Sequence, residues 1–487
     1  MLAMRSLILP SVFFVLAGVS IGCAPQAASP TGAATPLTAE AATSAYMESV
    51  RNDPGKLLLF LREMPKGGDL HNHLGGSIYA ESLIKWAGED GLCLSRPTMS
   101  LKPQPCVARR DEIAAADIPR DPALNTQVID AWSMRNWNPA KKSGHDQFFD
   151  SFEKFDLATL RHQGDMLAEA VQRAAEQNIS YMELMTAPDD GGFINLGIST
   201  GFDTDFARLK DRLIARGLRD TVAVAKTHLN QSETKQRKLM RCEVVPAPPG
   251  CRVVVRYLYQ VLRGLPPQAV FAQILGGFEM ATADSRVVGF NLVMPEDYPV
   301  PMNDFLLHMR MIDYLHSVYP SVKISLHAGE LSEGLVPPEG MRFHIRESVV
   351  RGHARRIGHG TSILNETDAP SLLREMAEKR IMVEVALSSA DAILGIKGGK
   401  HPLRTYLSYG VPVALATDDE GVLRTNITTD YRKAVEEQLL DYKTLKALAR
   451  NSIVYAFVED DIKGRLISQL EREFTSFEEQ YAKRTQQ

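Results

Sequence analysis

The chain has no basic stripe and no long run of lysine or arginine among its 487 residues. Its 55 basic and 59 acidic residues give a formal net charge of −4, which is nearly neutral for this length. Nucleic-acid-binding domains neutralise phosphates with a clustered basic surface, so this charge pattern argues against nucleic acid as a partner. The 44% of hydrophobic and 23% of charged residues are typical of a globular protein with a large core.

Cysteine is scarce: the chain has five and no Cys-x-x-Cys spacing, so neither a redox motif nor a thiolate zinc site is predicted. Four of the five form two close pairs, Cys93 with Cys106 and Cys242 with Cys251, and each pair encloses a proline-containing loop. Two local disulfides are one interpretation, and an oxidising compartment would permit both. Four unpaired thiols are the other. In either case the cysteines are structural.

The chain also lacks an uninterrupted apolar segment of about 20 residues, the length that a membrane-spanning helix needs. Arg5 precedes an apolar stretch that Pro10 interrupts and that ends in Ser20-Ile-Gly-Cys23, which resembles a bacterial lipobox. We expect residues 1–22 to be a lipoprotein signal peptide. Lipid on Cys23, the only membrane contact expected, would anchor an exported, periplasmic protein to the outer membrane. The alternative is ordinary secretory cleavage nearby, which would leave the protein secreted.

Residues 23–45, rich in Ala, Ser, Thr and Pro, are predicted to form a flexible tether before a barrel domain at 46–487. From residue 59 onward short β-branched runs alternate with amphipathic helical segments, the pattern of parallel βα units. The predicted strands are 68–74, 179–186, 252–259, 287–294, 322–328, 356–360, 381–387 and 411–417. The predicted helices between them include 165–177, 268–280, 303–317 and 371–379. A (β/α)8 TIM barrel follows most economically.

The region at about 88–144 does not fit this repeat, and we interpret it as an insertion after the first strand. It contains the first cysteine pair, several prolines, Trp132 and Trp137. The two tryptophans could stack on a ligand base or form a small core of the insertion itself.

Reactive side chains fall where the predicted strands end. His71 and His73 close the first strand, and strand alternation places both imidazoles on one face. His327 ends the fifth strand, and Asp418 with Asp419 follows the eighth. Because the C-terminal ends of barrel strands meet at one face, these residues are expected to converge as metal ligands.

Four motifs, in this order and at strand ends, resemble signatures of the adenosine deaminase family. They are Met64-Pro-Lys-Gly-Gly-Asp-Leu-His-Asn-His73, His327-Ala-Gly-Glu330, Arg356-Ile-Gly-His-Gly360 and Thr417-Asp-Asp419. The Met-Pro-Lys-Gly-Gly lead and the long insertion are more similar to the extracellular, growth-factor-related branch than to the compact cytosolic enzymes.

The resemblance implies one Zn²⁺ per chain, held by His71, His73, His327 and Asp418, with a bound water that becomes hydroxide near neutral pH and attacks purine C6. It implies roles for three catalytic residues and one substrate contact. Glu330 would protonate ring N1, His359 would orient or deprotonate the water, Asp419 would bond purine N7, and the Gly289 backbone would approach N3. Taken singly, each has a structural alternative: Glu330 in a salt bridge, His359 packed in a turn, and the two aspartates as a helix cap.

Two departures from the family pattern concern the substrate. Compact cytosolic adenosine deaminases have an aspartate that contacts the ribose 5′-hydroxyl where this chain has Gly75. Glu420 replaces a proline after the paired aspartates and is expected to add a carboxylate near the mouth. Glu183, interpreted as ending the second strand, could replace the lost ribose contact or be a buried structural carboxylate.

The resemblance therefore predicts hydrolytic deamination of a small-molecule purine nucleoside, adenosine or 2′-deoxyadenosine, outside the cytoplasm. One rival hypothesis keeps the zinc hydrolase and changes the substrate to another aminopurine or a modified adenosine. A second is a barrel-derived binding or signalling protein without catalysis. The acid, base and metal residues argue against the second, because a binder needs no such set.

Overall fold

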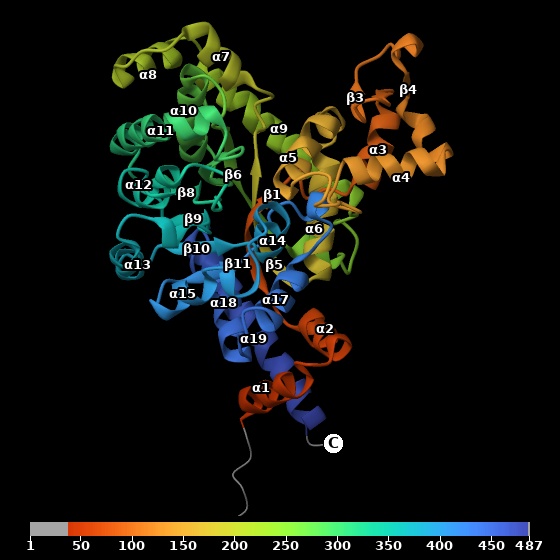
Figure 1. Cartoon of the computed structure of the whole chain (residues 1–487), viewed down its shortest axis with the longest axis vertical. Coiled ribbons are helices and arrows are strands. Elements are labelled where there is room, and N and C mark those ends of the chain that lie inside the picture. Colours follow the sequence, from red (N-terminus) through yellow and green to blue (C-terminus); the bar gives the residue numbers. More distant parts are fainter. Residues whose placement is uncertain (1–37, 486–487) are drawn as a thin grey trace, which may run out of the picture. The chain divides into compact units, whose positions relative to one another are not determined.

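The computed structural model describes residues 38–485, and Figure 1 shows how their helices surround a central sheet. The expected signal peptide and Cys23 lie outside the described residues. Eight parallel strands form one sheet in the order β1-β5-β6-β7-β8-β9-β10-β11. They are β1 (Gly67–His73), β5 (Ile179–Thr186), β6 (Val254–Leu262), β7 (Val287–Val293), β8 (Lys323–Ala328), β9 (Arg356–His359), β10 (Met382–Val385) and β11 (Val413–Leu415).

The sheet closes on itself between its first and last strands. His73 N donates to Asp418 O, and Asp418 N donates to His71 O, so the segment after β11 pairs with β1. The predicted eight-stranded barrel is confirmed, and each of its strands overlaps one of the eight predicted segments.

Helices connect the strands and cover the barrel. They are α1 (Ala39–Val50), α2 (Pro54–Glu63), α3 (Ala80–Glu89), α4 (Pro122–Ala131), α5 (Gly144–Phe155), α6 (Gln163–Glu176), α7 (Gly192–Thr200), α8 (Phe206–Ala215), α9 (Leu218–Leu239), α10 (Pro267–Ala283), α11 (Pro299–Val318), α12 (His344–Val350), α13 (Ala369–Glu378), α14 (Leu387–Leu394), α15 (Leu403–Ser408), α16 (Glu420–Leu423), α17 (Ile427–Glu436), α18 (Tyr442–Val454) and α19 (Asp460–Thr485). Prolines in the first turns of α10 and α11 supply the φ that a helix start requires. The four predicted helices correspond to α6, α10, α11 and α13.

The flexible tether predicted for residues 23–45 extends too far toward the C-terminus. α1 begins at Ala39, Thr38 caps it by accepting from Ala41 N, and Ala42 and Thr43 are buried. Alanine enriches flexible linkers but is also the strongest helix former, so composition alone did not separate the two states. Packing against α19 stabilises this helix, with the rings of Tyr46 and Tyr481 4.8 Å apart.

Both predicted cysteine pairs form disulfides, with Cα–Cα separations of 5.4 Å for Cys93–Cys106 and 5.6 Å for Cys242–Cys251. The first joins β2 to the segment after β3, in a small antiparallel sheet of β2 (Cys93–Ser95), β3 (Ser100–Lys102) and β4 (Glu112–Ala114) that sequence analysis did not predict. Trp132 is buried and donates from Nε1 to Met99 O, so it belongs to the insertion's own core.

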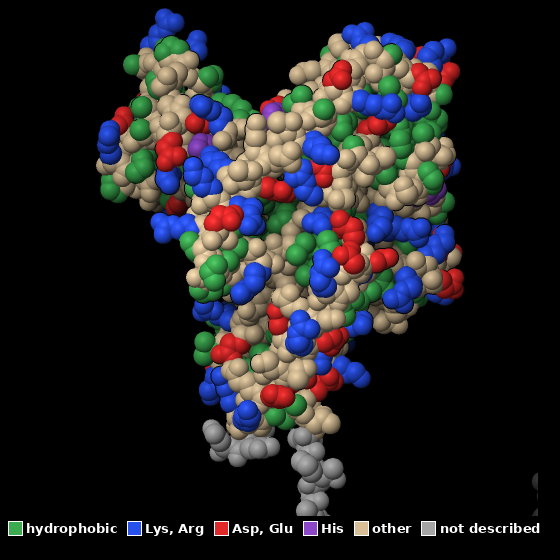
Figure 2. All heavy atoms as spheres, turned by 180° about the vertical axis from the view of Figure 1, so that it is seen from behind, with side chains coloured by type: hydrophobic (Ala, Val, Ile, Leu, Met, Phe, Trp, Pro, Cys, Tyr) green, Lys and Arg blue, Asp and Glu red, His purple; other side chains and the backbone are tan. Residues whose placement is uncertain are grey.

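Basic and acidic side chains lie interspersed over the face shown in Figure 2. Among residues 38–485, no helix has both the length and the apolar character needed to cross a membrane.

Candidate active site

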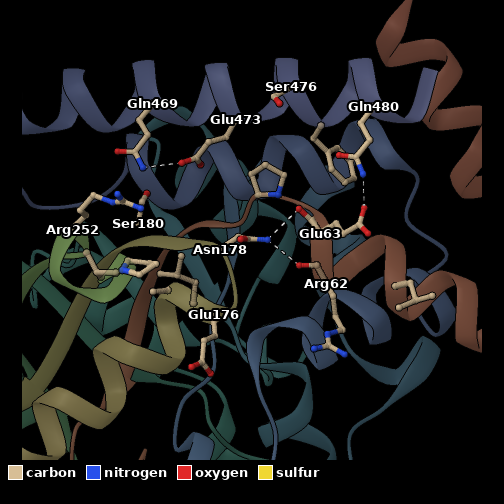
Figure 3. Close-up of a pocket in the computed structure, with 17 residues that line it drawn as sticks. Arg62, Glu63, Glu176, Asn178, Ser180, Arg252, Gln469, Glu473, Ser476 and Gln480 are labelled. Atoms are coloured by element: carbon tan, nitrogen blue, oxygen red, sulfur yellow. Dashed lines mark hydrogen bonds between the residues drawn. The ribbon is translucent and has the colours of Figure 1, made fainter. Parts of the chain in front are cut away.

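A broad hollow of about 910 Å³ lies at the N-terminal ends of β1, β5 and β6 (Figure 3). Its polar groups are largely paired with one another: Asn178 Nδ2 donates to the carbonyls of Arg62 and Glu63, and Gln469 Nε2 donates to Glu473. No histidine or cysteine is among the described residues that line it. This end of the barrel therefore has no reactive set.

A second cavity, of about 530 Å³, lies at the C-terminal ends of the strands, where β/α barrels carry their chemistry. The strand-end residues that line it are His73, Met185, Thr186, Gln260, Leu262, Val293, His327 and His359. Glu330, Asp418 and Asp419 also line it, so three carboxyl groups share one cavity with the histidines.

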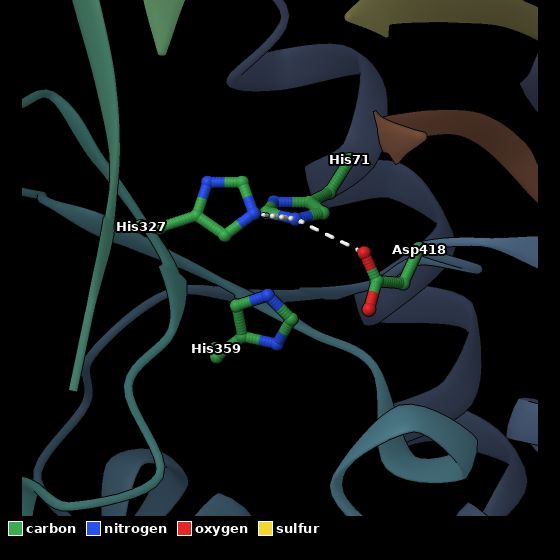
Figure 4. Close-up of side chains that lie close together, drawn as sticks. All are labelled: His71, His327, His359 and Asp418. Atoms are coloured by element: carbon green, nitrogen blue, oxygen red, sulfur yellow. Dashed lines mark hydrogen bonds and ion pairs between the residues drawn. The ribbon is translucent and has the colours of Figure 1, made fainter. Parts of the chain in front are cut away.

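The four predicted metal ligands converge at the buried end of this cavity. His71 Nε2 lies 3.0 Å from His327 Nε2 and 3.6 Å from Asp418 Oδ1 (Figure 4). His73 Nε2 lies 3.2 Å and 3.4 Å from the same two atoms. Tetrahedral zinc with bonds of ~2.1 Å holds its ligand atoms ~3.4 Å apart, which these separations match. His359 lies beside the group, and one of its ring nitrogens is within 4.8 Å of a possible ligand atom of each of His71, His327 and Asp418.

Hydrogen bonds on the far side of the rings direct lone pairs into the cluster. His71 Nδ1 lies 2.7 Å from Glu384 Oε2, and His327 Nδ1 lies 2.8 Å from Asn291 Oδ1, which also accepts from His327 N. Both partners are acceptors, so each Nδ1 carries the proton and each Nε2 presents a lone pair. Several acceptor atoms facing one another at these distances require a cation between them, and the residues therefore fit a metal.

Burial keeps most of these imidazoles neutral. It lowers the pKa of His73 to about 4 and that of His327 well below its usual range. For His71 burial also opposes protonation, but the hydrogen bond and charge of Glu384 outweigh it and raise the pKa.

A buried network of charged side chains contacts His71 at Nδ1, on the side of the ring away from the metal-binding cluster. Arg356 Nε lies 2.5 Å from Glu384 Oε1, and the Arg356 guanidinium also pairs with Glu183. Ser325 Oγ donates to Glu384 at 3.0 Å. Arg356 and Glu183 have fully buried side chains, so the network fixes the orientation of the His71 ring in a region without solvent.

Glu183 is not a substrate contact. It lies within β5, three residues before Thr186, and does not line the cavity. Its Oε1 accepts from Tyr181 Oη at 2.8 Å and from Phe457 N at 2.6 Å. The second interpretation, a buried structural carboxylate, is correct, because a strand-interior side chain of the barrel points into the layer beneath the site.

Glu330 is held in the cavity wall by its backbone. Gly329 N donates to Glu296 Oε1 at 3.1 Å, and Glu330 N donates to Glu296 Oε2 at 2.8 Å, which leaves the Glu330 carboxyl free to face the cavity. Burial and the nearby charge of Asp418 raise its pKa well above the usual range, which favours the protonated carboxyl.

Two buried polar atoms in the cavity wall, His359 Nε2 and Asp419 Oδ1, have no hydrogen-bond partner within the described chain. Burial lowers the pKa of His359 to about 3, so its ring is neutral, and burial with Asp418 raises the pKa of Asp419 well above the usual range. His359 also adopts a φ of 62°, which is uncommon for a residue with a side chain. Unpaired buried polar groups and backbone strain are typical of ligand sites.

The prediction for Gly289 is wrong. Gly289 lies near the start of β7 and does not line the cavity; a Cβ there would collide with Lys323 O of the adjacent strand. The glycine permits close pairing of β7 with β8. The residue that follows β7 and lines the cavity is Met294, which has a φ of 84°.

The two sequence departures have different outcomes. Gly75 lines the cavity, and a Cβ there would meet no atom within 4 Å. Glu420 does not line it: this buried carboxylate accepts from Gln177 Nε2 at 2.6 Å and pairs with Arg173 at 3.4 Å. Glu420 therefore adds no carboxylate to the mouth, because it begins α16 with its side chain turned toward α6.

Sequence analysis missed the aromatic part of the cavity wall. Four phenylalanines of α5 line it: Phe148, Phe149, Phe152 and Phe155. Phe148, Phe152 and Phe155 follow one another at intervals of four and three residues, which places them on one helical face. This spacing could have indicated the aromatic wall, although an ordinary core helix shows the same pattern.

A family model described as adenosine deaminase matches residues 120–473. Adenine deaminase of Sinorhizobium medicae is 25% identical over 329 residues, which are 66% of this chain and 85% of that protein. Adenosine deaminase of Shewanella loihica is 33% identical over 144 residues, 29% of this chain and 40% of that protein. Aminodeoxyfutalosine deaminase of Streptomyces coelicolor is 32% identical over 126 residues, and the match spans only 32% of its length.

Two solved structures share the fold. N6-methyl-AMP deaminase from Arabidopsis thaliana has a TM-score of 0.56 at 20% identity, covering 85% of this chain and 98% of that one. A cog1816 amidohydrolase from Burkholderia ambifaria, solved with bound Zn, has a TM-score of 0.54 at 18% identity, covering 88% and 94%. Because the family match spans most of the barrel that carries these acidic and histidine groups, the chain belongs to the adenosine deaminase family and is an aminohydrolase.

Proposed function

We propose that the chain hydrolyses adenosine or 2′-deoxyadenosine to the corresponding inosine and ammonia, with one zinc ion held by His71, His73, His327 and Asp418. The convergence of these four side chains at the closed end of a cavity that also holds Glu330, His359 and Asp419 carries the proposal. Zinc held there would lower the pKa of a bound water to near 7.

The remaining chemistry belongs to the protein's own side chains. Glu330, whose pKa burial raises, would donate a proton to purine N1 and make C6 electrophilic. His359 Nε2, neutral and unpaired, would accept a proton from the water that adds to C6. Asp419, protonated in its buried setting, would donate to N7. The proton taken up by His359 would then pass to the amino group, the C6–N bond would break and ammonia would leave, while the C6 hydroxyl would return its proton to Glu330 as the C6 carbonyl of the product forms.

Replacing Glu330 with Gln tests this assignment. The variant should retain zinc and bind purine but lose about 10²- to 10⁴-fold in turnover, since an amide cannot supply the proton. Glu279→Gln is a matched control, because Glu279 is 8% exposed like Glu330 but pairs with Arg219 and Tyr319. Ammonia release at near wild-type rate from Glu330→Gln would remove Glu330 from this role.

Adenine is a second candidate substrate, because the match to an adenine deaminase spans 66% of this chain. Ammonia release from adenine, adenosine and 2′-deoxyadenosine by the zinc-loaded protein separates the candidates.

We also propose that the protein acts outside the cytoplasm. The two disulfides support an oxidising compartment, and the Ser20-Ile-Gly-Cys23 sequence supports a lipid anchor. The long insertion supports membership of the growth-factor-related branch.

A further inference from the structure

The mouth of the catalytic cavity has a distinct composition. Tyr298 and Leu160, which line it, are 39% and 64% exposed, whereas the metal-binding cluster is buried, so they mark the open end. A purine with C6 at the buried cluster must direct its ribose toward this end. What lies at the mouth therefore decides which 5′ substituents are accepted.

The α5 side of the cavity is an aromatic wall, which we define as Phe148, Phe149, Phe152, Phe155 and Tyr298. The ring centroids of Phe148 lie 5.0 Å from Phe149 and 5.3 Å from Phe152, and Phe155 lies 5.5 Å from Phe152. Tyr298 lies 6.4 Å from Phe149. Interlocked rings of this kind form a continuous apolar surface.

The wall is braced from two sides. Gln147 of α5 donates to Asp130 O and Ser133 O of the inserted region at 3.1 Å and 3.0 Å. His145 lies 2.9 Å from Asp297, which fixes α5 to the loop that carries Tyr298. A braced apolar surface is preorganised for an apolar ligand group, because its side chains lose little further conformational freedom on binding.

The charged side chains that line the cavity beside the wall are all acidic. The described residues that line the cavity include no Lys or Arg, while Glu153, Asp156 and Asp190 are exposed at its mouth. Arg263 is buried nearby but does not line the cavity, and it donates to the carbonyls of Met294 and His327. A 5′-phosphate would be stripped of water beside carboxylates with no cation to receive it.

At the position where the family resemblance expects an aspartate for the 5′-hydroxyl, the chain has Gly75, which offers no acceptor side chain, and Glu183 and Glu420 are engaged elsewhere. We propose that, given the deaminase function proposed above, the site is specific for purine nucleosides whose 5′ group is uncharged and apolar, such as a 5′-thioether, and rejects nucleoside 5′-phosphates. Burial of one methylene against the wall favours such a substrate about fourfold, from 0.8 kcal/mol.

Three probes test this: adenosine, 5′-deoxy-5′-methylthioadenosine and 5′-AMP. The zinc-loaded protein should show a kcat/KM at least fourfold higher for the methylthio compound than for adenosine, and at least 100-fold lower for 5′-AMP. Equal or lower kcat/KM for the methylthio compound, or 5′-AMP within tenfold of adenosine, would overturn the proposal. A preference for 5′-amino-5′-deoxyadenosine over the thioether would also overturn it, in favour of a cationic group.

Variants at the mouth locate the effect. Phe152→Ser should abolish the thioether preference, and Phe152→Leu should keep most of it, which separates lost apolar surface from misfolding. Glu153→Lys should raise kcat/KM for 5′-AMP at least tenfold relative to adenosine, with a smaller rise for the neutral Glu153→Gln. Unchanged ratios in Phe152→Ser and Glu153→Lys would show that the mouth does not set specificity.

The deaminase proposal and this one can fail separately. If adenosine is deaminated without the thioether preference, only the specificity inference fails. If no purine releases ammonia, the proposed function fails, and equilibrium dialysis of the same three probes against the Glu330→Gln protein still measures the preference for an apolar 5′ group.

Discussion

Replacing Glu384 with Gln isolates the contribution of the buried network to metal affinity. Glu384 accepts from His71 Nδ1 at 2.7 Å and pairs with Arg356 at 2.5 Å, and both the histidine and the carboxylate are at most 1% exposed. The amide keeps the shape and one acceptor oxygen but removes the charge. Arg356 retains Glu183 as a counter-ion, so no buried guanidinium is left alone.

The expected size of the effect follows from the type of hydrogen bond lost. A bond to a charged group contributes about 1.5–3 kcal/mol and one between neutral groups about 0.5–1.5 kcal/mol, so the exchange costs about 1–2 kcal/mol. That corresponds to a fall in zinc affinity of about 5- to 30-fold, which overlaps the range of about 10- to 100-fold typical of residues that orient a metal ligand.

Zinc affinity can be measured by competition with a chromophoric chelator, and thermal unfolding reports the fold. Glu478→Gln is the matched control: its carboxylate accepts from Tyr442 and Lys446 far from the site. It should lose stability without losing zinc affinity. Wild-type zinc affinity in Glu384→Gln would refute the idea that the network supports the metal site.

Two further predictions concern the rest of the chain. Burial raises the pKa of Asp430 to about 7, above the ~3.9 of an unfolded chain. The loss of folding stability that comes from ionising this carboxyl is therefore absent below about pH 4 and grows as pH rises to 7. Asp430→Asn can keep the contacts to Ser388 and should flatten this decline in urea unfolding between pH 5 and pH 8; parallel profiles would contradict the assignment. Cys23→Ser should move the protein from the detergent to the aqueous phase with unchanged deaminase activity, and aqueous partitioning of unmodified wild type would leave ordinary secretion.

The sequence predicted the barrel and the convergence of the four candidate metal ligands for the same reason. Strand periodicity is local, and His71, His73, His327 and Asp418 all stand where a periodic run ends. Strand ends of a closed parallel sheet must meet, so a one-dimensional pattern sufficed to bring distant residues together.

Depth along a strand was not predicted, and two assignments failed for this reason. At about 3.3 Å per residue, Glu183 lies about 10 Å below Thr186, and Gly289 lies about 13 Å below Val293. Whether the residue is glutamate or glycine does not indicate how deep in the barrel its position lies. The aromatic wall was missed because the phenylalanines of α5 have the same helical spacing whether they face the core or a cavity.

The last prediction uses the open space at Gly75 to restore the missing ribose contact. A Cβ at Gly75 meets no atom within 4 Å, whereas at Gly76 it would collide with Asp419, so only Gly75 accepts a side chain. Gly75→Asp should raise the ratio of kcat/KM for adenosine over 5′-deoxyadenosine from near one by about 10- to 150-fold, since a hydrogen bond to a charged group contributes about 1.5–3 kcal/mol. Gly75→Asn should give a smaller rise and Gly75→Ala none. A wild-type ratio already far above one would show that another group holds the 5′-hydroxyl, and a ratio unchanged in Gly75→Asp would place the ribose away from this position.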